Sequence, residues 1–197
     1  MEIAHNESHL CARSATRVYC SGRNGVGQLG REGASSARLT AVEGLPLERT
    51  PRSVAVGYDT TNGFTLVALD DGSVWCWGAN ESSQCGRPAS TSEAPAPVPG
   101  LARVIQVSAG VQSACARDDG GDVFCWGSNH EGRTGNGVLG GPDVEVPTRV
   151  DLPVPIGWIG TEGGSVMAVA ADGASVYGWG GNTQGLLGLG PGAGAQP

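Results

Sequence analysis

The chain has 197 residues, a formal net charge of −7, 34 glycines and no lysine. The absence of a basic stripe argues against nucleic-acid binding. No apolar run reaches the roughly 18 residues of a membrane-spanning helix, so no membrane insertion is expected. Many glycines among short runs of Val, Trp, Tyr and Phe are typical of a turn-rich, all-β protein.

One sequence motif occurs four times along the chain. Each copy begins with Val and an aromatic residue and leads through a glycine and an asparagine to a further glycine. The copies run over residues 18–30, 74–86, 123–135 and 176–188. Their asparagines, Asn24, Asn80, Asn129 and Asn182, are spaced by 56, 49 and 53 residues. A period near 50 residues predicts blade-like β-repeats.

Further short apolar runs precede each copy of the motif. One group of runs stands directly before it, at 10–13, 66–69, 114–117 and 168–170. Another group lies further upstream, at 53–56, 104–107 and 156–159. The turns at Asp70-Asp71-Gly72 and Asp118-Asp119-Gly120 predict hairpins, because glycine provides the positive φ that a tight turn needs. We therefore interpret these aspartates as turn formers and not as metal ligands.

Each repeat holds about four short strands, which is the content of a propeller blade. The predicted fold is all-β, with about four β-propeller blades of roughly 50 residues in a single partial propeller over 1–197. The approximate blades are 1–30, 31–86, 87–135 and 136–190, followed by a flexible tail, 191–197.

The motif residues are expected to pack between neighbouring blades. This repeat core comprises Gly22, Asn24, Trp75, Trp77, Gly78, Asn80, Trp126, Gly127, Asn129, Trp179, Gly180 and Asn182. The four tryptophans have an alternative interpretation as interface hot spots. Trp158 lies outside the motif and is a candidate interface residue.

Two cysteine pairs flank hairpin turns at matched positions. Cys11 and Cys20 are nine residues apart, and Cys115 and Cys125 are ten apart. Facing residues of antiparallel strands are close enough for a disulfide. The alternative is buried free thiols. Disulfides favour an oxidising compartment.

The other repeats differ in their cysteines. In the fourth, Val169 and Gly178 stand at the two positions, so both cysteines are absent together. In the second, Val67 replaces the first cysteine, which leaves Cys76 with Cys85 as its one remaining candidate partner. A Cys76–Cys85 bond is a weaker prediction.

No catalytic constellation is evident, and we expect a protein that is not an enzyme. There is no nucleophile elbow of the G-x-S-x-G type. The glycine-rich stretches recur at every repeat and lack a following Lys, so they are structural. His5, His9 and His130 are scattered. The sequence therefore predicts no metal site and no cofactor.

The pattern Val-aromatic-x-Trp-Gly-x-Asn-x-x-Gly-Gln-Leu-Gly resembles the repeat of the regulator of chromosome condensation family. Ser21, Cys85 and the Arg133-Thr134 pair depart from it. The resemblance implies a seven-bladed β-propeller. Four repeats are incomplete relative to that ring, so we expect a fragment, or a propeller completed by missing sequence or by another chain.

The predicted function is a non-enzymatic, protein-binding scaffold, with an unknown protein as partner. Candidate binding loops are Arg31–Arg38, Arg87–Pro95 and Thr134–Glu145. The composition suggests a bacterial source, and the paired cysteines suggest export to the periplasm or the extracellular space. The N-terminus has no signal-peptide pattern, which truncation would explain, and a cytoplasmic location is the alternative.

Two other functions remain open. The namesake of the family is an exchange factor for a small GTPase, so the resemblance also allows a guanine-nucleotide exchange function. Its exchange residues cannot be matched to positions in this chain. The chain could instead be a structural repeat segment of a larger surface or adhesion protein.

Overall fold

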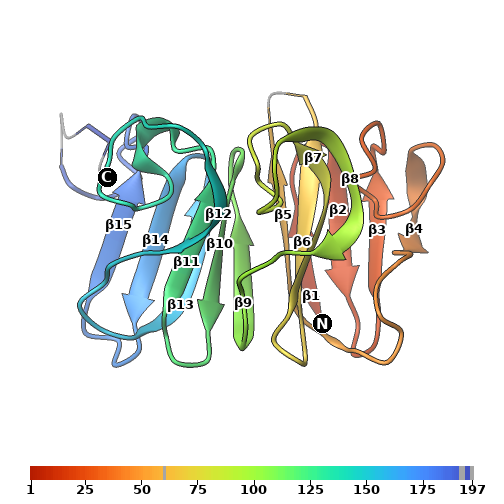
Figure 1. Ribbon diagram of the computed structural model, residues 1–197, viewed down its shortest axis with the longest axis horizontal. Coiled ribbons are helices and arrows are strands. Elements are labelled where there is room, and N and C mark those ends of the chain that lie inside the picture. Colours follow the sequence, from red (N-terminus) through yellow and green to blue (C-terminus); the bar gives the residue numbers. More distant parts are fainter. Residues whose placement is uncertain (60, 191–193, 196–197) are drawn as a thin grey trace.

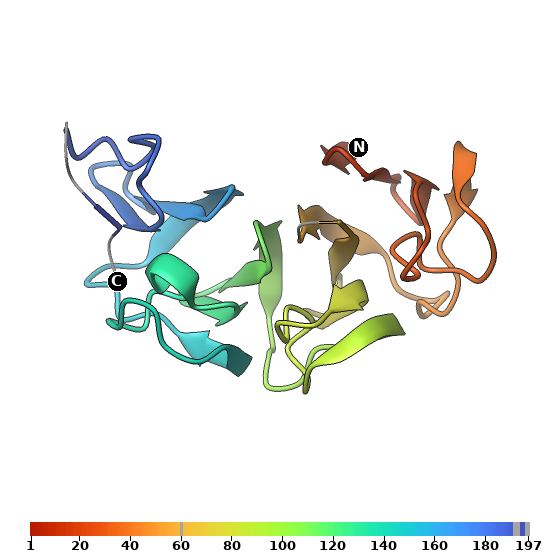
Figure 2. The same cartoon turned by 90° about the horizontal axis from the view of Figure 1, so that it is seen from above.

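The computed structural model describes residues 1–59, 61–190 and 194–195. Four antiparallel sheets stand side by side in an open arc, which makes the fold a partial β-propeller (Figures 1 and 2). The all-β prediction is therefore confirmed. Within the described part of the chain, no helix is long and apolar enough to span a membrane. Most of the predicted tail, 191–197, lies outside the described residues.

The first two sheets have four strands each, in sequence order. The first consists of β1 (Glu2–His5), β2 (His9–Arg13), β3 (Val18–Gly22) and β4 (Ser36–Ala41). The second consists of β5 (Pro51–Tyr58), β6 (Gly63–Leu69), β7 (Val74–Asn80) and β8 (Ser90–Pro97). Short hairpins join the first three strands, and a longer loop leads to the outer strand.

The third sheet repeats this pattern, and the fourth has three described strands. The third consists of β9 (Val104–Ala109), β10 (Ser113–Asp118), β11 (Val123–Gly127) and β12 (Val144–Arg149), with a 3-10 turn, η1 (His130–Gly132), in the long loop. The fourth consists of β13 (Ile156–Glu162), β14 (Ser165–Ala170) and β15 (Val176–Gly180).

The sheets divide the chain at different points from the repeat-based bounds 1–30, 31–86, 87–135 and 136–190. The outer strand β4 pairs with β3, so the first sheet extends to Ala41. In the same way, β8 pairs with β7 and β12 with β11. The Pro-containing segments between motif copies are thus outer strands that close the preceding blade. Pro is tolerated there because an edge strand leaves an N–H unpaired.

The core lies in three seams between neighbouring sheets. Each seam contains one buried apolar cluster with members from both sheets. In the middle of the arc, all seven residues of β6 are buried, because sheets cover both of its faces. A single blade cannot bury its own faces, so stacking provides the core.

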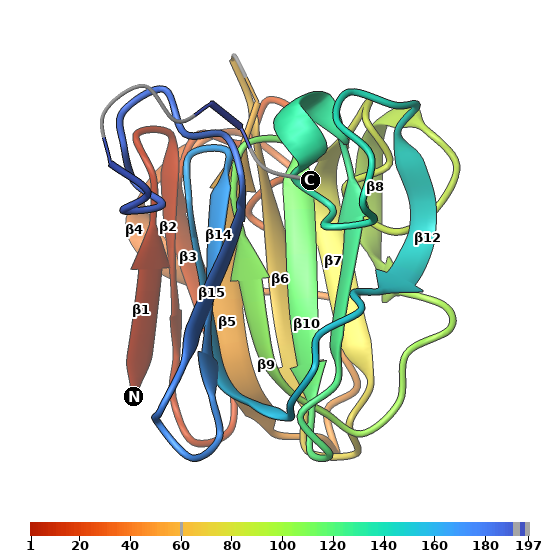
Figure 3. The same ribbon diagram turned by 90° about the vertical axis from the view of Figure 1, so that its left-hand side faces the viewer.

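The two ends of the blades differ. The tight hairpins between second and third strands lie at one end, and the long loops after each motif asparagine gather at the other (Figures 1 and 3). The asparagine side chains organise these loops. For example, Asn80 Oδ1 accepts the Cys85 N–H at 2.8 Å, and its Nδ2 donates to the Pro88 carbonyl at 2.9 Å. Asn24, Asn129 and Asn182 make the same bond to the fifth residue after them.

Candidate protein-binding surface

Three of the four motif tryptophans are structural. Trp77, Trp126 and Trp179 are buried in the three seams. Each indole N–H donates to a loop carbonyl of the preceding blade, and these carbonyls belong to Gln28 (3.0 Å), Gln84 (2.9 Å) and Arg133 (3.1 Å). These side chains therefore join the blades and are not available to a partner.

A second bond crosses each seam between neighbouring inner strands, on the concave side of the arc. A side chain of one inner strand accepts the backbone N–H of the next: Glu2 from Val54 (3.2 Å), Ser53 from Val107 (3.3 Å) and Gln106 from Ile159 (3.1 Å). Gln106 also donates to the Ile159 carbonyl at 2.8 Å. By strand register, the fourth residue of this series is Trp158, which has no acceptor to offer.

Disulfide bonds are present in three blades. Cys11 pairs with Cys20 and Cys115 with Cys125, both across directly facing strand positions with Cα atoms 4.1 Å apart. Cys76 pairs with Cys85 over 5.3 Å and so joins a strand to the following loop. All three bonds lie in the seam clusters, so they stiffen the face that each blade turns to the next.

The strand register corrects two positions in the cysteine pattern. Leu66, and not Val67, faces Cys76, because Val67 pairs with Trp75. Met167, and not Val169, faces Gly178. Between the two facing positions, the hairpin of the second blade is one residue longer than that of the first blade, and the hairpin of the fourth is two residues longer. The residue that faces Cys76 or Gly178 therefore lies further back in the sequence than the spacing of the first blade predicts.

Among the three histidines, only His9 is buried, with 3% of its surface exposed. It lies in the first seam, where its Nε2 is 2.9 Å from Thr65 Oγ1 and its Nδ1 is 3.1 Å from Ser8 Oγ. Burial lowers the pKa of His9 to about 4, so the ring is neutral near pH 7. His9 therefore has a structural role that the sequence reasoning missed.

The predicted turn-forming aspartates have the expected contacts. Asp71 Oδ1 accepts the Ser73 N–H at 3.0 Å and the Ser73 hydroxyl at 2.7 Å, and these bonds lower the pKa of Asp71. Asp118 Oδ1 accepts the N–H groups of Gly120 and Asp122, both at 2.9 Å. Both side chains thus cap the turns that follow them.

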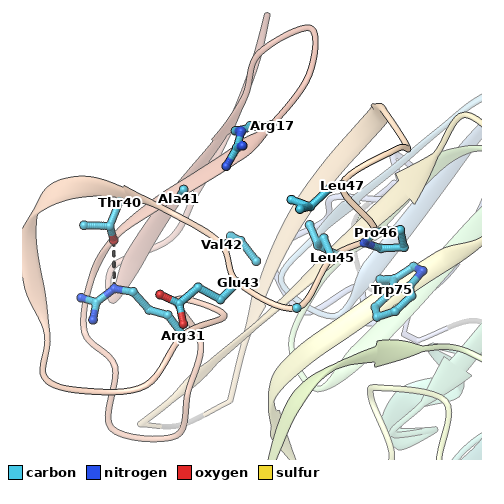
Figure 4. A pocket seen from close by; sticks show the side chains of 11 residues that line it. Arg17, Arg31, Thr40, Ala41, Val42, Glu43, Leu45, Pro46, Leu47 and Trp75 are labelled. Carbon is cyan, nitrogen blue, oxygen red and sulfur yellow. Dashed lines mark hydrogen bonds between the residues drawn. The ribbon is translucent and has the colours of Figure 1, made fainter.

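Trp75 differs from the other motif tryptophans because it is only partly buried. It lines a cavity of about 1000 Å³ at the outer edge of the first seam, together with Leu45, Pro46 and Leu47 (Figure 4). Leu47 is 84% exposed. We call the cavity lined by these four residues the Trp75 pocket. The exposed Leu47 and the partly buried Trp75 together form an apolar surface at this edge.

Two arginines border the Trp75 pocket on its other side (Figure 4). Arg31 is held in place, because its guanidinium donates to Thr40 Oγ1 at 2.9 Å and to two loop carbonyls. Arg17 is exposed at the end of the β2–β3 hairpin. The pocket thus combines Trp, Leu and Arg, and Trp and Arg are enriched among residues that dominate protein interfaces.

The pocket arises from a longer connector in the first seam. Five residues, 46–50, separate Leu45 from the inner strand that starts at Pro51. In the second seam only two, 102 and 103, separate Leu101 from Val104. Leu45 and Leu101 both pack against seam clusters. Leu47 lies in the longer connector, 46–50. A comparison of the connector lengths in the sequence could have identified this segment.

The structure brings two of the three predicted binding loops together. Residues 31–33 of the first loop and 92–95 of the second line a cavity of about 480 Å³. Of its charged residues, Glu93 is paired with Arg87 at 3.3 Å and Arg31 donates to Thr40 Oγ1 at 2.9 Å. The third loop, Thr134–Glu145, lies further along the arc and does not line this cavity. This cavity and the Trp75 pocket share Arg31, Glu43 and Gly44 in their linings.

The candidate interface residue Trp158 is 51% exposed on β13 and lies against Gly160. It lines a shallow cavity of about 640 Å³, to which all four inner strands contribute. Trp158 is therefore on the concave side of the arc, whereas the Trp75 pocket is on its outer side. These are two separate surfaces.

Comparisons with known proteins agree with this fold. Two family models described as "Regulator of chromosome condensation (RCC1) repeat" match residues 71–117 and residues 52–84 with 104–133. Human WBSCR16 is 24% identical, with a TM-score of 0.83 over 98% of this chain and 51% of its own. Prp20p from Saccharomyces cerevisiae is 18% identical, with a TM-score of 0.81 over 99% and 48%.

A further yeast structure, RCC1 (Prp20) bound to Kap60, is 21% identical, with a TM-score of 0.77 over 99% of this chain and 46% of that one. The chain therefore spans about half the length of these solved propellers. Residues 52–133 thus contain repeats that match the regulator of chromosome condensation repeat, as the motif predicts.

Proposed function

We propose that this chain is a non-enzymatic scaffold that binds a partner protein through the Trp75 pocket. The observation that carries the proposal is the apolar lining of the pocket, made by the exposed Leu47 and the partly buried Trp75 and Pro46, next to Arg17. It stands on a rigid frame, because β7, which bears Trp75, is paired on both edges and joined to its loop by a disulfide. A pre-formed apolar site saves part of the ordering cost of binding.

The charge of the pocket indicates the chemistry of the partner. Neither arginine at the rim has an ion pair among the described residues, but Arg31 is held by hydrogen bonds to neutral groups near it, so Arg17 is the cation we expect to meet a partner. A partner segment with an apolar side chain and a nearby carboxylate would fill the pocket and pair with Arg17. Two of the solved yeast structures support protein binding in general, because Prp20 is bound to Kap60 in one and Prp20p has binding properties to Gsp1p and histones in the other.

We place this scaffold outside the cytosol, as an exported protein. The support is the three disulfides, which persist in oxidising compartments. Intact mass before and after reduction, with thiols trapped at lysis, tests this part. Free thiols in the native protein would contradict export and would make nucleotide exchange on a small GTPase in the cytosol the next function to assay.

The binding site is tested by photo-crosslinking. A photoreactive amino acid replaces Leu47, and a matched control replaces Leu139, which is 53% exposed in the third loop. We expect a partner that crosslinks at position 47 only and is competed by excess wild-type protein but not by Leu47→Asp. Equal capture at both positions, or competition by Leu47→Asp, would contradict the proposal.

A further inference from the structure

The outer strand of the first blade, β4, has one edge that no described strand covers. It is the last strand of its sheet and stands on the outside of the arc (Figures 1 and 2). Val42 donates its N–H to a carbonyl of β3 at 3.0 Å, and Thr40, two residues earlier, pairs with β3 as well. Because hydrogen-bonded positions alternate along an antiparallel strand, the N–H and C=O groups of Leu39 and Ala41 point outward.

Proline closes the same edge in the second and third blades. By register, Leu39 corresponds to Pro95 in β8 and to Pro147 in β12. Ala41 corresponds to Pro97 in β8. Proline has no N–H with which to bind an added strand, and natural sheets use it to protect exposed edges. β4 contains no proline, so it keeps both outward N–H groups, unlike the other two described outer strands.

Positive charge accompanies this open edge. Arg38 lies on β4, is exposed, and has no ion pair among the described residues. Arg31 is held beside the strand by its 2.9 Å bond to Thr40 Oγ1 (Figure 4). From the β2–β3 turn to the end of β4, residues 14–41 contain four arginines and one glutamate, although the whole chain has a net charge of −7. Glu43 also lines the Trp75 pocket but lies beyond the end of the strand.

We propose that β4 binds an extended, acidic segment of the partner protein as an added fifth strand. The segment would exchange backbone hydrogen bonds with Leu39 and Ala41, as in other cases of strand addition to a sheet edge. Its carboxylates would lie near Arg38, and one apolar side chain would enter the Trp75 pocket. Thr40 and Ala41 line that pocket, so the edge and the pocket are continuous. This inference rests on the proposed function, because it names the kind of segment that the pocket receives.

A second copy of this chain fits the open edge poorly. Leu39 and Ala41 would have to pair with the same two positions of the other copy, because these residues offer the outward groups. In such an antiparallel pair the Thr40 side chains of both copies lie on one face, and each has Arg31 bound to it. Like charges that meet across strands are destabilising, so an acidic segment is the better occupant.

The test is a peptide selection on the oxidised, full-length chain. A phage-displayed library of random dodecapeptides is selected in parallel on wild type and on Leu39→Pro. The variant should fold, because proline stands at this position in the other two outer strands, and Leu39 does not line the pocket. We expect wild type alone to enrich peptides that carry several carboxylates around an apolar residue. Absence of such peptides, or their equal enrichment on both proteins, would overturn the proposal.

The most enriched peptide then reports the binding geometry. At saturation, amide hydrogen exchange at Leu39 and Ala41 should slow by at least about tenfold. Leu39→Pro should weaken binding of this peptide at least about tenfold. Arg149→Pro is the matched control, because it places proline at an outward position of β12 that corresponds to Ala41, and it should leave the Kd unchanged. Protection of other amides alone would contradict an added strand at β4.

Three further outcomes separate the open edge from the pocket and from self-association. If excess Leu39→Pro competes for the partner crosslinked at position 47 as well as wild type does, the added strand is wrong and the proposed function stands. If the peptide protects Leu39 and Ala41 equally in wild type and in Leu47→Asp, the added strand is supported and the pocket is contradicted. Self-association in sedimentation that Leu39→Pro abolishes would identify a second copy as occupant and overturn the proposal.

Discussion

The second and fourth blades have the same motif but very different burial. Every residue of β6 in the second blade is buried, whereas β15 in the fourth blade has exposed residues in its first half. The difference comes from the neighbours, because sheets cover the second blade on both sides and the fourth on one. Stability in this fold therefore belongs to the seams more than to the individual blades.

Replacement of a seam tryptophan should have the largest effect. Trp126→Ala removes a fully buried side chain and its bond to the Gln84 carbonyl, and should lower the free energy of unfolding by about 3–5 kcal/mol. Trp158→Ala is the matched control on the half-exposed fourth blade, and should change it by less than about 0.5 kcal/mol. Denaturant unfolding measures both changes. Similar losses of unfolding free energy in the two variants would show that stability does not lie mainly in the seams.

Acid should weaken the first seam through His9. Its pKa is about 4 in the folded chain against 6.5 when exposed, so the unfolded state binds a proton at higher pH. This contribution is present above pH 6.5 and is lost as the pH falls from 6.5 to 4, by about 3 kcal/mol. Denaturant unfolding at a series of pH values measures the effect.

The second blade offers the control for this pH dependence. It has Phe64 at the position of His9, since both face a motif glycine across the hairpin. His9→Phe should therefore remove the His9 part of the pH dependence, while the carboxylates titrate equally in both proteins. Parallel pH profiles of wild type and variant would contradict the assignment.

Removal of a disulfide should cost somewhat less. Cys115→Ala with Cys125→Ala opens a loop of ten residues, which predicts a loss of about 2–3 kcal/mol from loop-closure entropy. Cys76→Ala with Cys85→Ala opens a loop of nine residues and should lose a similar amount. Thermal unfolding of both double variants under oxidising conditions measures this. A much larger loss for the second would show that it stabilises its loop beyond the entropy of closure.

The smallest predicted effect concerns the bonds between neighbouring inner strands. Gln106→Ala removes two hydrogen bonds to the Ile159 backbone and should cost about 1–3 kcal/mol. Amide hydrogen exchange at Ile159 should accelerate in this variant, while exchange at Val54 in the first seam stays unchanged. Equal acceleration of exchange at both sites would indicate global destabilisation and not the loss of the two local hydrogen bonds to Ile159.

The repeated architecture could be predicted from the sequence because its signals are local. Turns such as Asp118-Asp119-Gly120 sit between apolar runs, and the motif recurs at a nearly constant spacing. Cys11 and Cys20 flank a short hairpin, so their proximity follows from strand pairing alone. The family motif and the solved propellers agree with this part.

The site could be predicted only in part. Hairpin length sets which residue faces Cys76, and the sequence pattern does not reveal that it is Leu66. Trp75 and Trp77 occupy the same motif, but Trp77 is buried in the seam, whereas Trp75 is partly buried and lines a pocket with residues of the longer first connector. Such features depend on how neighbouring sheets meet, and a single repeat contains no information about that.

The indole bonds also give the row of blades a direction. Each of the three seams has its donor on the later blade and its acceptor on the earlier one. The second and third blades carry both groups, so each of them donates an indole bond to the preceding blade and accepts one from the following blade. The first blade, with Ser21, can serve only as an acceptor. Each inner blade thus has a donor side and an acceptor side. Duplication of the gene segment for an inner blade would lengthen the arc and create another seam with the same indole bond.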